Sequence, residues 1–86
     1  MAKVRDNIDL KTLKERRRAI GLSGAQLANM VGVTKQTISN VECGRQYSLA
    51  VIKLMDYYIN DYYEQHIDEF SDKFKTYYKW LSDLET

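Results

Sequence analysis

The sequence contains no proline and little glycine, so few residues in it would interrupt a long helix. Among its 86 residues there are four glycines, no proline and a single cysteine, Cys43. A chain with so few helix breakers is expected to be largely helical. One cysteine excludes an internal disulfide and fits a reducing compartment. Because the chain also lacks an apolar run of about 18 residues and a signal-peptide pattern, we expect one cytoplasmic domain with no membrane partner.

Acidic residues are scarce in the first half of the chain and basic residues are scarce in the second, although the net charge is only +1. Residues 1–55 hold ten Lys and Arg against four Asp and Glu, a balance of +6. Residues 56–86 hold three against eight, a balance of −5. A basic first half indicates a polyanionic partner, and the acidic second half should face away from it.

Three short helices are predicted in the first half, each beginning after a capping side chain and ending at a glycine. The predicted caps and stops are Asp9 and Gly21, Ser23 and Gly32, and Thr34 and Gly44. Ser23 and Gln26 form a weak capping-box pattern. A fourth apolar segment begins at Leu49.

A regular apolar pattern then continues to the C-terminus at spacings of three and four residues. Its members are Ile59, Tyr63, Ile67, Phe70, Phe74, Tyr77, Leu81 and Leu84. Such a heptad pattern is typical of a helix that packs along another helix. It predicts an extended C-terminal helix over residues 59–86, appended to a domain of residues 1–58, with Asn60-Asp61 as the one possible interruption.

This helix could fold back on its own domain or pair with a second copy. About three and a half heptads exceed what a small body can cover, so homodimerisation through these residues is favoured, with Trp80 at the rim.

The predicted third helix carries polar side chains on one face and Ile38 and Val41 on the other. The polar residues are Lys35, Gln36, Ser39 and Asn40. These residue types donate and accept hydrogen bonds at base edges, although the same face could be ordinary solvated surface. Two short helices joined at Gly32-Val33 are the helix-turn-helix arrangement, whose second helix enters the major groove.

Residues 10–55 resemble the Xre/Cro-type helix-turn-helix transcriptional regulators of bacteria and phages. The matching string is LKERRRAIGLSGAQLANMVGVTKQTISNVECGR. The resemblance implies an all-α, compact four- to five-helix, lambda-repressor-like DNA-binding domain, here with the extended C-terminal helix. It implies that Lys35, Gln36, Ser39 and Asn40 read bases and that Arg17 and Glu42 form a structural salt bridge. The positions expected to contact phosphate are Ser23, Gly24, Ala25, Thr34, Thr37, Arg45 and Arg18.

Two positions depart from the family pattern. Gly24 stands where the family usually has a glutamine that contacts phosphate, although backbone N–H groups there could still bind phosphate. Arg16 stands at a commonly apolar position, so either its side chain snorkels to the surface or the register of the first helix is shifted. Lys14 and Arg18 are either phosphate ligands or a solvated face.

No other pattern points to enzymatic or cofactor chemistry. His66 lacks a companion metal ligand, so we expect no metal. Cys43 is either a redox sensor or a tolerated residue near the DNA backbone. The tyrosine pairs could stack single-stranded bases, but their acidic surroundings favour a packing surface. We expect no enzyme and no cofactor.

The favoured function is a dimeric, sequence-specific regulator of double-stranded DNA. We expect a repressor on an inverted-repeat operator, located in the cytoplasm with the nucleoid, of host, phage or mobile-element origin. The alternative is an antitoxin-like protein-interaction module whose C-terminal helix binds another protein and whose DNA binding serves autoregulation.

Overall fold

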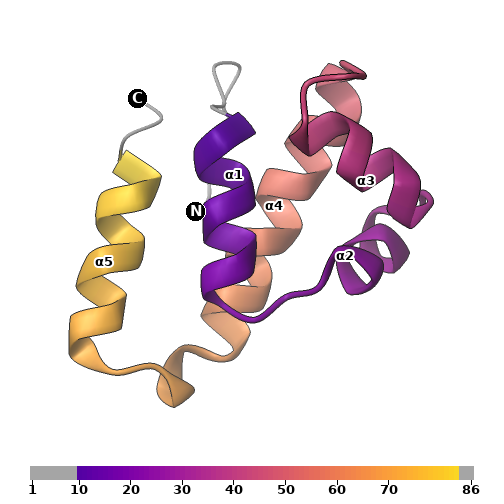
Figure 1. Ribbon diagram of the computed structural model, residues 1–86. Coiled ribbons are helices and arrows are strands. Elements are labelled where there is room, and N and C mark those ends of the chain that lie inside the picture. The colour runs from indigo at the N-terminus through magenta and orange to yellow at the C-terminus, as the bar shows by residue number, and fades with distance from the viewer. Residues whose placement is uncertain (1–9, 84–86) are drawn as a thin grey trace.

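The structure is a computed structural model that describes residues 10–83 of the chain, and within that range it is all-α. The elements are α1 (Leu10–Ala19), α2 (Gly24–Val31), α3 (Lys35–Glu42), α4 (Leu49–Gln65), a short 3-10 helix η1 (Ile67–Glu69) and α5 (Asp72–Asp83). The all-α fold class is therefore confirmed (Figure 1). The predicted cap Asp9 and the seam residue Leu84 lie outside the described residues.

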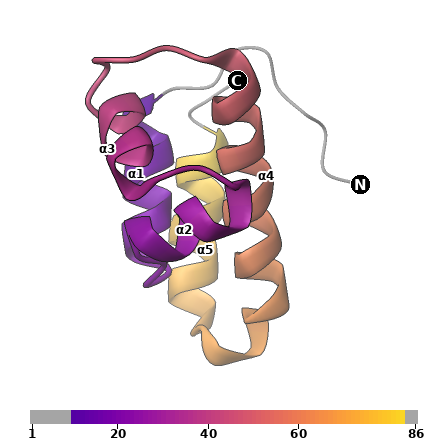
Figure 2. The ribbon, with the colours of Figure 1, turned by 90° about the vertical axis from the view of Figure 1, so that its right-hand side faces the viewer.

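Helix α1 is the central element of the arrangement. It packs against α3, α4 and α5, while α2 packs against α3 and α4. Figure 1 shows α5 on the side of α1 that is opposite to the α2–α3 pair, and Figure 2 shows α2 and α3 crossing in front of the longer helices. The two short helices therefore form one side of the molecule, and α5 forms another.

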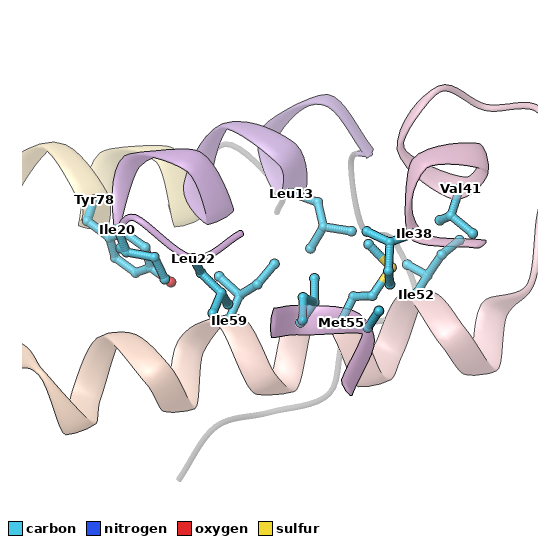
Figure 3. Close-up of a cluster of buried hydrophobic side chains, with 11 residues drawn as sticks. Leu13, Ile20, Leu22, Ile38, Val41, Ile52, Met55, Ile59 and Tyr78 are labelled. Carbon is cyan, nitrogen blue, oxygen red and sulfur yellow. The ribbon is translucent and has the colours of Figure 1, made fainter. Parts of the chain in front are cut away.

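The core is built from side chains of all five helices (Figure 3). Its fully buried members include Leu13, Leu27, Ile38, Val41, Ile52, Met55, Ile59 and Leu81. Each such side chain contributes roughly 1.5–3 kcal/mol when it is removed from water. Because Ile38 and Val41 belong to this core, α3 is held by its inner face.

The prediction of one extended C-terminal helix is wrong. Helix α4 ends at Gln65, the chain turns through η1, and α5 begins at Asp72. Ser71 caps α5, since its Oγ accepts a hydrogen bond from the Phe74 N–H at 3.1 Å. The turn lets the ring of Tyr63 stack on that of Tyr78 with centroids 3.9 Å apart. The helix start at Ser71-Asp72 and this aromatic contact favour a chain reversal over the continuous helix that the apolar spacing predicts.

The seam residues consequently meet within one chain. Ile59 and Leu81 are fully buried, and Tyr63, Phe70 and Phe74 are partly buried against the core. Ile67 and Tyr77 are exposed. Helix α4 also runs without a break across residue 58, the boundary predicted between two units, and through Asn60-Asp61.

Arg16 neither snorkels nor marks a shifted register. Its side chain is completely buried, and its guanidinium contacts the Asp56 carboxylate at 2.6 Å. Its Nη1 donates to Asn60 Oδ1 at 2.9 Å, and the Tyr78 hydroxyl donates to the same oxygen at 2.6 Å. This polar network joins α1, α4 and α5. Burial raises the pKa of Tyr78 to about 12, against the opposing effect of the Arg16 charge.

Within residues 10–83, none of the helices combines the length and the apolar character needed to cross a membrane.

Candidate nucleic-acid interface

The turn between α2 and α3 is set by a glycine in a left-handed conformation. Gly32 has a φ of 89°, and its N–H donates to the Ala28 carbonyl at 2.8 Å. The N–H of Val33 donates to the same carbonyl at 3.0 Å. A residue with a Cβ is strained at such a φ. This closed turn directs the chain from α2 straight into α3.

Both short helices begin at side-chain caps. The Ser23 Oγ accepts from the Gln26 N–H, and the Gln26 side chain accepts from the Ser23 N–H, each at 3.0 Å, which completes a capping box. Thr34 Oγ1 accepts from the Thr37 N–H at 3.1 Å and lies 2.9 Å from the Thr37 hydroxyl. These caps satisfy first-turn donors that would otherwise lack partners.

The outer face of α3 presents the side chains predicted to read bases. Lys35, Gln36 and Ser39 are exposed, and Asn40 is partly buried. Gln36 Nε2 donates to Asn40 Oδ1 at 3.0 Å, so these two amides are already oriented by each other. Bidentate pairing of Gln or Asn with adenine requires such an amide facing the groove. The four residues therefore form one continuous polar face on α3.

The inner side of α3 is anchored to α1 by an ion pair. Arg17 Nε donates to Glu42 Oε2 at 2.7 Å, and Arg17 Nη2 donates to Glu42 Oε1 at 3.1 Å. Both side chains are largely buried, and Arg17 Nη1 also donates to the Leu22 carbonyl at 2.8 Å. A bidentate pair of this kind fixes direction as well as distance. It holds the end of α3 at a defined position against α1.

The predicted phosphate contacts lie around α2, α3 and the link that follows. Ser23, Ala25, Thr34 and Arg45 are exposed, and Gly24 and Thr37 are partly exposed. Gly24 and Ala25 lie in the first turn of α2, where helix N–H groups have no internal partner. Arg18 lies apart from these, beside a shallow depression of about 430 Å³ between α1 and the end of α3. Lys14 lines the same depression.

The two other candidate chemical groups are Cys43 and His66, and neither belongs to a metal-binding cluster in the part of the chain that the structure describes. Cys43 is exposed at the C-terminal end of α3. His66 stacks on Tyr62 with ring centroids 4.1 Å apart and lies 4.0 Å from Glu69. No group of three or more His, Cys, Asp or Glu side chains that could hold a metal ion occurs in residues 10–83.

Sequence reasoning missed the buried polar network of Arg16, Asp56, Asn60 and Tyr78. A signal was available, because Arg16 follows Leu13 by three residues and Asp56 lies among the apolar residues of α4. Two opposite charges on the inward faces of two helices predict a buried ion pair, since an unpaired buried charge is too costly.

Comparison with known proteins identifies one family. The sequence matches the family described as Helix-turn-helix, of the Xre and lambda-repressor type, over residues 13–56, just over half of the chain. The matched segment begins in α1 and ends in α4, so it includes the capped helices, the Gly32 turn and the Arg17–Glu42 pair. No curated protein and no solved structure matches the chain significantly.

Proposed function

The chain belongs to the helix-turn-helix family of the Xre and lambda-repressor type, whose members are DNA-binding regulators, and we propose that it is a dimeric, sequence-specific repressor. The main observation in support of this proposal is that α3 has a buried inner face and a polar outer face. Its inner face is held by the core and by Arg17, while its outer face presents four hydrogen-bonding side chains.

Each outer side chain has a distinct role in the major groove. Lys35 donates to guanine O6 or N7, Gln36 and Asn40 pair with adenine, and Ser39 contacts either base. The hydrogen bond between Gln36 and Asn40 reduces the rotamer freedom that binding would otherwise remove. The attachment of α3 to the core and to Arg17 keeps all four side chains in a fixed arrangement.

Phosphate contacts orient the domain on the duplex without reading sequence. The proposed ligands of one phosphate are the N–H groups of Gly24 and Ala25, at the N-terminal end of α2. Ser23 caps that helix end, and Thr34 and Thr37 lie at the start of α3. Arg45 and Arg18 add positive charge near the C-terminal end of α3. Affinity is therefore expected to fall steeply with salt, because phosphate neutralisation releases counterions.

A dimer places two reading helices in successive major grooves. The operator is then an inverted repeat whose half-sites lie about 10–10.5 bp apart or a multiple of that distance. One short helix reads too few base pairs to select a complete operator, so the second copy is functionally required. Repression follows from occupying a promoter.

The test of base reading is Gln36→Ala, with Gln65→Ala as the matched control on the exposed end of α4. An operator is first selected from random duplex DNA. We expect Gln36→Ala to weaken operator binding by about 1–3 kcal/mol and to leave random-DNA binding nearly unchanged. Equal weakening on both DNAs, or an effect matched by Gln65→Ala, would contradict the role of α3 in sequence reading.

The second candidate function is an antitoxin-like module that binds another protein through its C-terminal region. Exposure of Tyr77 and Trp80 on α5 favours it, since their rings lie 6.2 Å apart on the surface. The two candidates differ in the mass of the purified protein. A stable homodimer supports the repressor, and a monomer at micromolar concentration supports the module, because its exposed aromatic pair then lacks a partner.

A further inference from the structure

Helix α4 carries an apolar face that points away from the core. Ala50, Lys53, Leu54 and Tyr57 line this face, which we term the α4 outer face, around a shallow depression of about 500 Å³. Leu54 is 42% exposed and Tyr57 49% exposed. The depression is lined almost entirely by apolar surface. These residues follow the three- and four-residue spacing of one helical stripe, on the side opposite to Ile52 and Met55.

We propose that a second copy of the chain covers the α4 outer face, through an antiparallel two-fold packing of α4 on α4 with Tyr57 near the axis. This inference rests on the proposed dimeric function and names the surface that forms the dimer. It replaces the heptad residues in that role, because Ile59 and Leu81 are already buried by their own chain.

Charge complementarity identifies the occupant as another copy. Lys53 and Asp61 lie four residues before and four residues after Tyr57, so both are on the same stripe. An antiparallel two-fold about Tyr57 places Lys53 of one protomer opposite the partner's Asp61, and the converse pair forms by symmetry. Leu54 and Tyr57 then fill the centre, with an ion pair at each rim.

The position of this face suits two reading helices on one duplex. Helix α4 begins directly after the short link from α3, and α4 packs against both α1 and α2. Figure 1 shows α4 beginning close to the end of α3, whereas α5 lies on the far side of α1 from α3. A dimer formed through α5 would place α3 at the two far ends of the assembly. A dimer formed through α4 brings the two copies of α3 closer to the roughly 34 Å of one DNA turn.

The primary test compares two tyrosines of similar exposure on two helices. Tyr57→Glu and Tyr77→Glu are purified as full chains, and dimer dissociation is measured without DNA by sedimentation equilibrium. Tyr57 is 49% exposed and Tyr77 44% exposed, so neither change disrupts the core. We expect Tyr57→Glu to weaken the dimer by about 30-fold or more, since it places a carboxylate at the centre of the interface. Tyr77→Glu should leave the dimer unchanged.

A charge-reversal series tests the antiparallel geometry and does not depend on Tyr57. Lys53→Glu and Asp61→Lys should each weaken the dimer, and the double variant should restore it, because both intermolecular pairs are rebuilt with reversed polarity. Failure of the double variant to recover would overturn the antiparallel pairing.

Two further results would contradict the dimer interface on α4, and a separate measurement tests base reading. A wild-type chain that stays monomeric, or a dimer lost with Tyr77→Glu but kept with Tyr57→Glu, would overturn the interface on α4. Base reading is tested separately on an isolated half-site with Gln36→Ala. A monomer that still discriminates the half-site would leave DNA reading standing while removing the dimer.

Discussion

At the scale of single residues, the most consequential side chains are polar and buried. Arg16 and Asp56 form an ion pair in the interior, and Asn60 Oδ1 accepts hydrogen bonds from both Arg16 and Tyr78. Such a pair adds little net stability, but removing one partner costs about 3–5 kcal/mol because a buried charge remains. The network therefore selects one packing of α1, α4 and α5 over alternatives.

Tyr78 makes the stability of the protein sensitive to alkaline pH. Its pKa is raised from 10.0 to about 12, mainly by burial, so the folded state keeps its proton where the unfolded state has lost it. Stability from this group is fully present below pH 10 and is lost as pH rises to 12, a total of about 3 kcal/mol. We expect Tyr78→Phe to remove this part of the alkaline loss, measured by urea unfolding at several pH values between 9 and 12.

The control for this prediction is Tyr47→Phe, because Tyr47 is the most exposed of the large hydrophobic side chains in residues 10–83. It should show the same alkaline loss as the wild type. Burial also raises the pKa of Tyr63, so a smaller alkaline loss remains in Tyr78→Phe. If Tyr78→Phe and the wild type lost stability in parallel, the proposed linkage would be refuted.

At the scale of elements, the local chemistry of α2 and α3 agrees closely with their tertiary roles. Each helix begins at a side-chain cap, and the turn between them closes at Gly32. Gly24 is the exception, since its backbone is ordinary and only the Lys35 Cγ, 4.0 Å away, lies near the position of an added Cβ. This glycine serves no conformational need.

Gly24→Ala is therefore expected to stabilise the protein by about 0.5–1 kcal/mol, because the unfolded chain loses freedom and no contact is strained. Gly32→Ala is the contrasting variant, since a φ of 89° strains any residue with a Cβ. It should destabilise the protein by about 1 kcal/mol or more. Urea unfolding measures both, and a loss of stability in Gly24→Ala would show an unrecognised role for that glycine.

At the scale of the whole molecule, α5 completes the packed domain that contains α3. It packs against α1, and its Tyr78 and Leu81 are buried. Tyr78 also reaches α4 through Asn60. Helix α5 of the acidic second half thus packs on α1 of the basic first half.

Truncation after Ser71 should consequently destabilise the monomer itself. Removing α5 deletes Tyr78 and Leu81 and exposes the core residues that they cover. Burial of each of these two side chains contributes roughly 1.5–3 kcal/mol to the free energy of unfolding. The total loss of about 3–6 kcal/mol is a large part of the stability of a small domain. Urea unfolding at two protein concentrations separates this loss from any effect on a dimer. An unchanged midpoint in the truncated chain would show that α5 is an accessory element.

The helix ends of the candidate site can be predicted from local sequence, but the chain reversal after α4 cannot. Ser23, Thr34 and Gly32 mark the helix ends through interactions within four residues of each, so sequence alone predicts them. The tail keeps three- and four-residue spacing through Ile67 and Phe70, although these residues belong to a turn. Periodicity cannot distinguish such a turn from a continuous helix when no proline or glycine marks it.

The sequence by itself determined that the chain is helical, that it contains a helix-turn-helix and which side chains α3 turns outward. Each of these depends on caps, glycines and apolar spacing within a short segment. Only the tertiary structure decided where the chain reverses after α4 and which groups the buried Arg16 meets. The reason is physical: a reversal depends on contacts such as Tyr63 with Tyr78, made by residues far apart in the chain. Such contacts form only when the helices pack together, so a local stretch of sequence does not predict them.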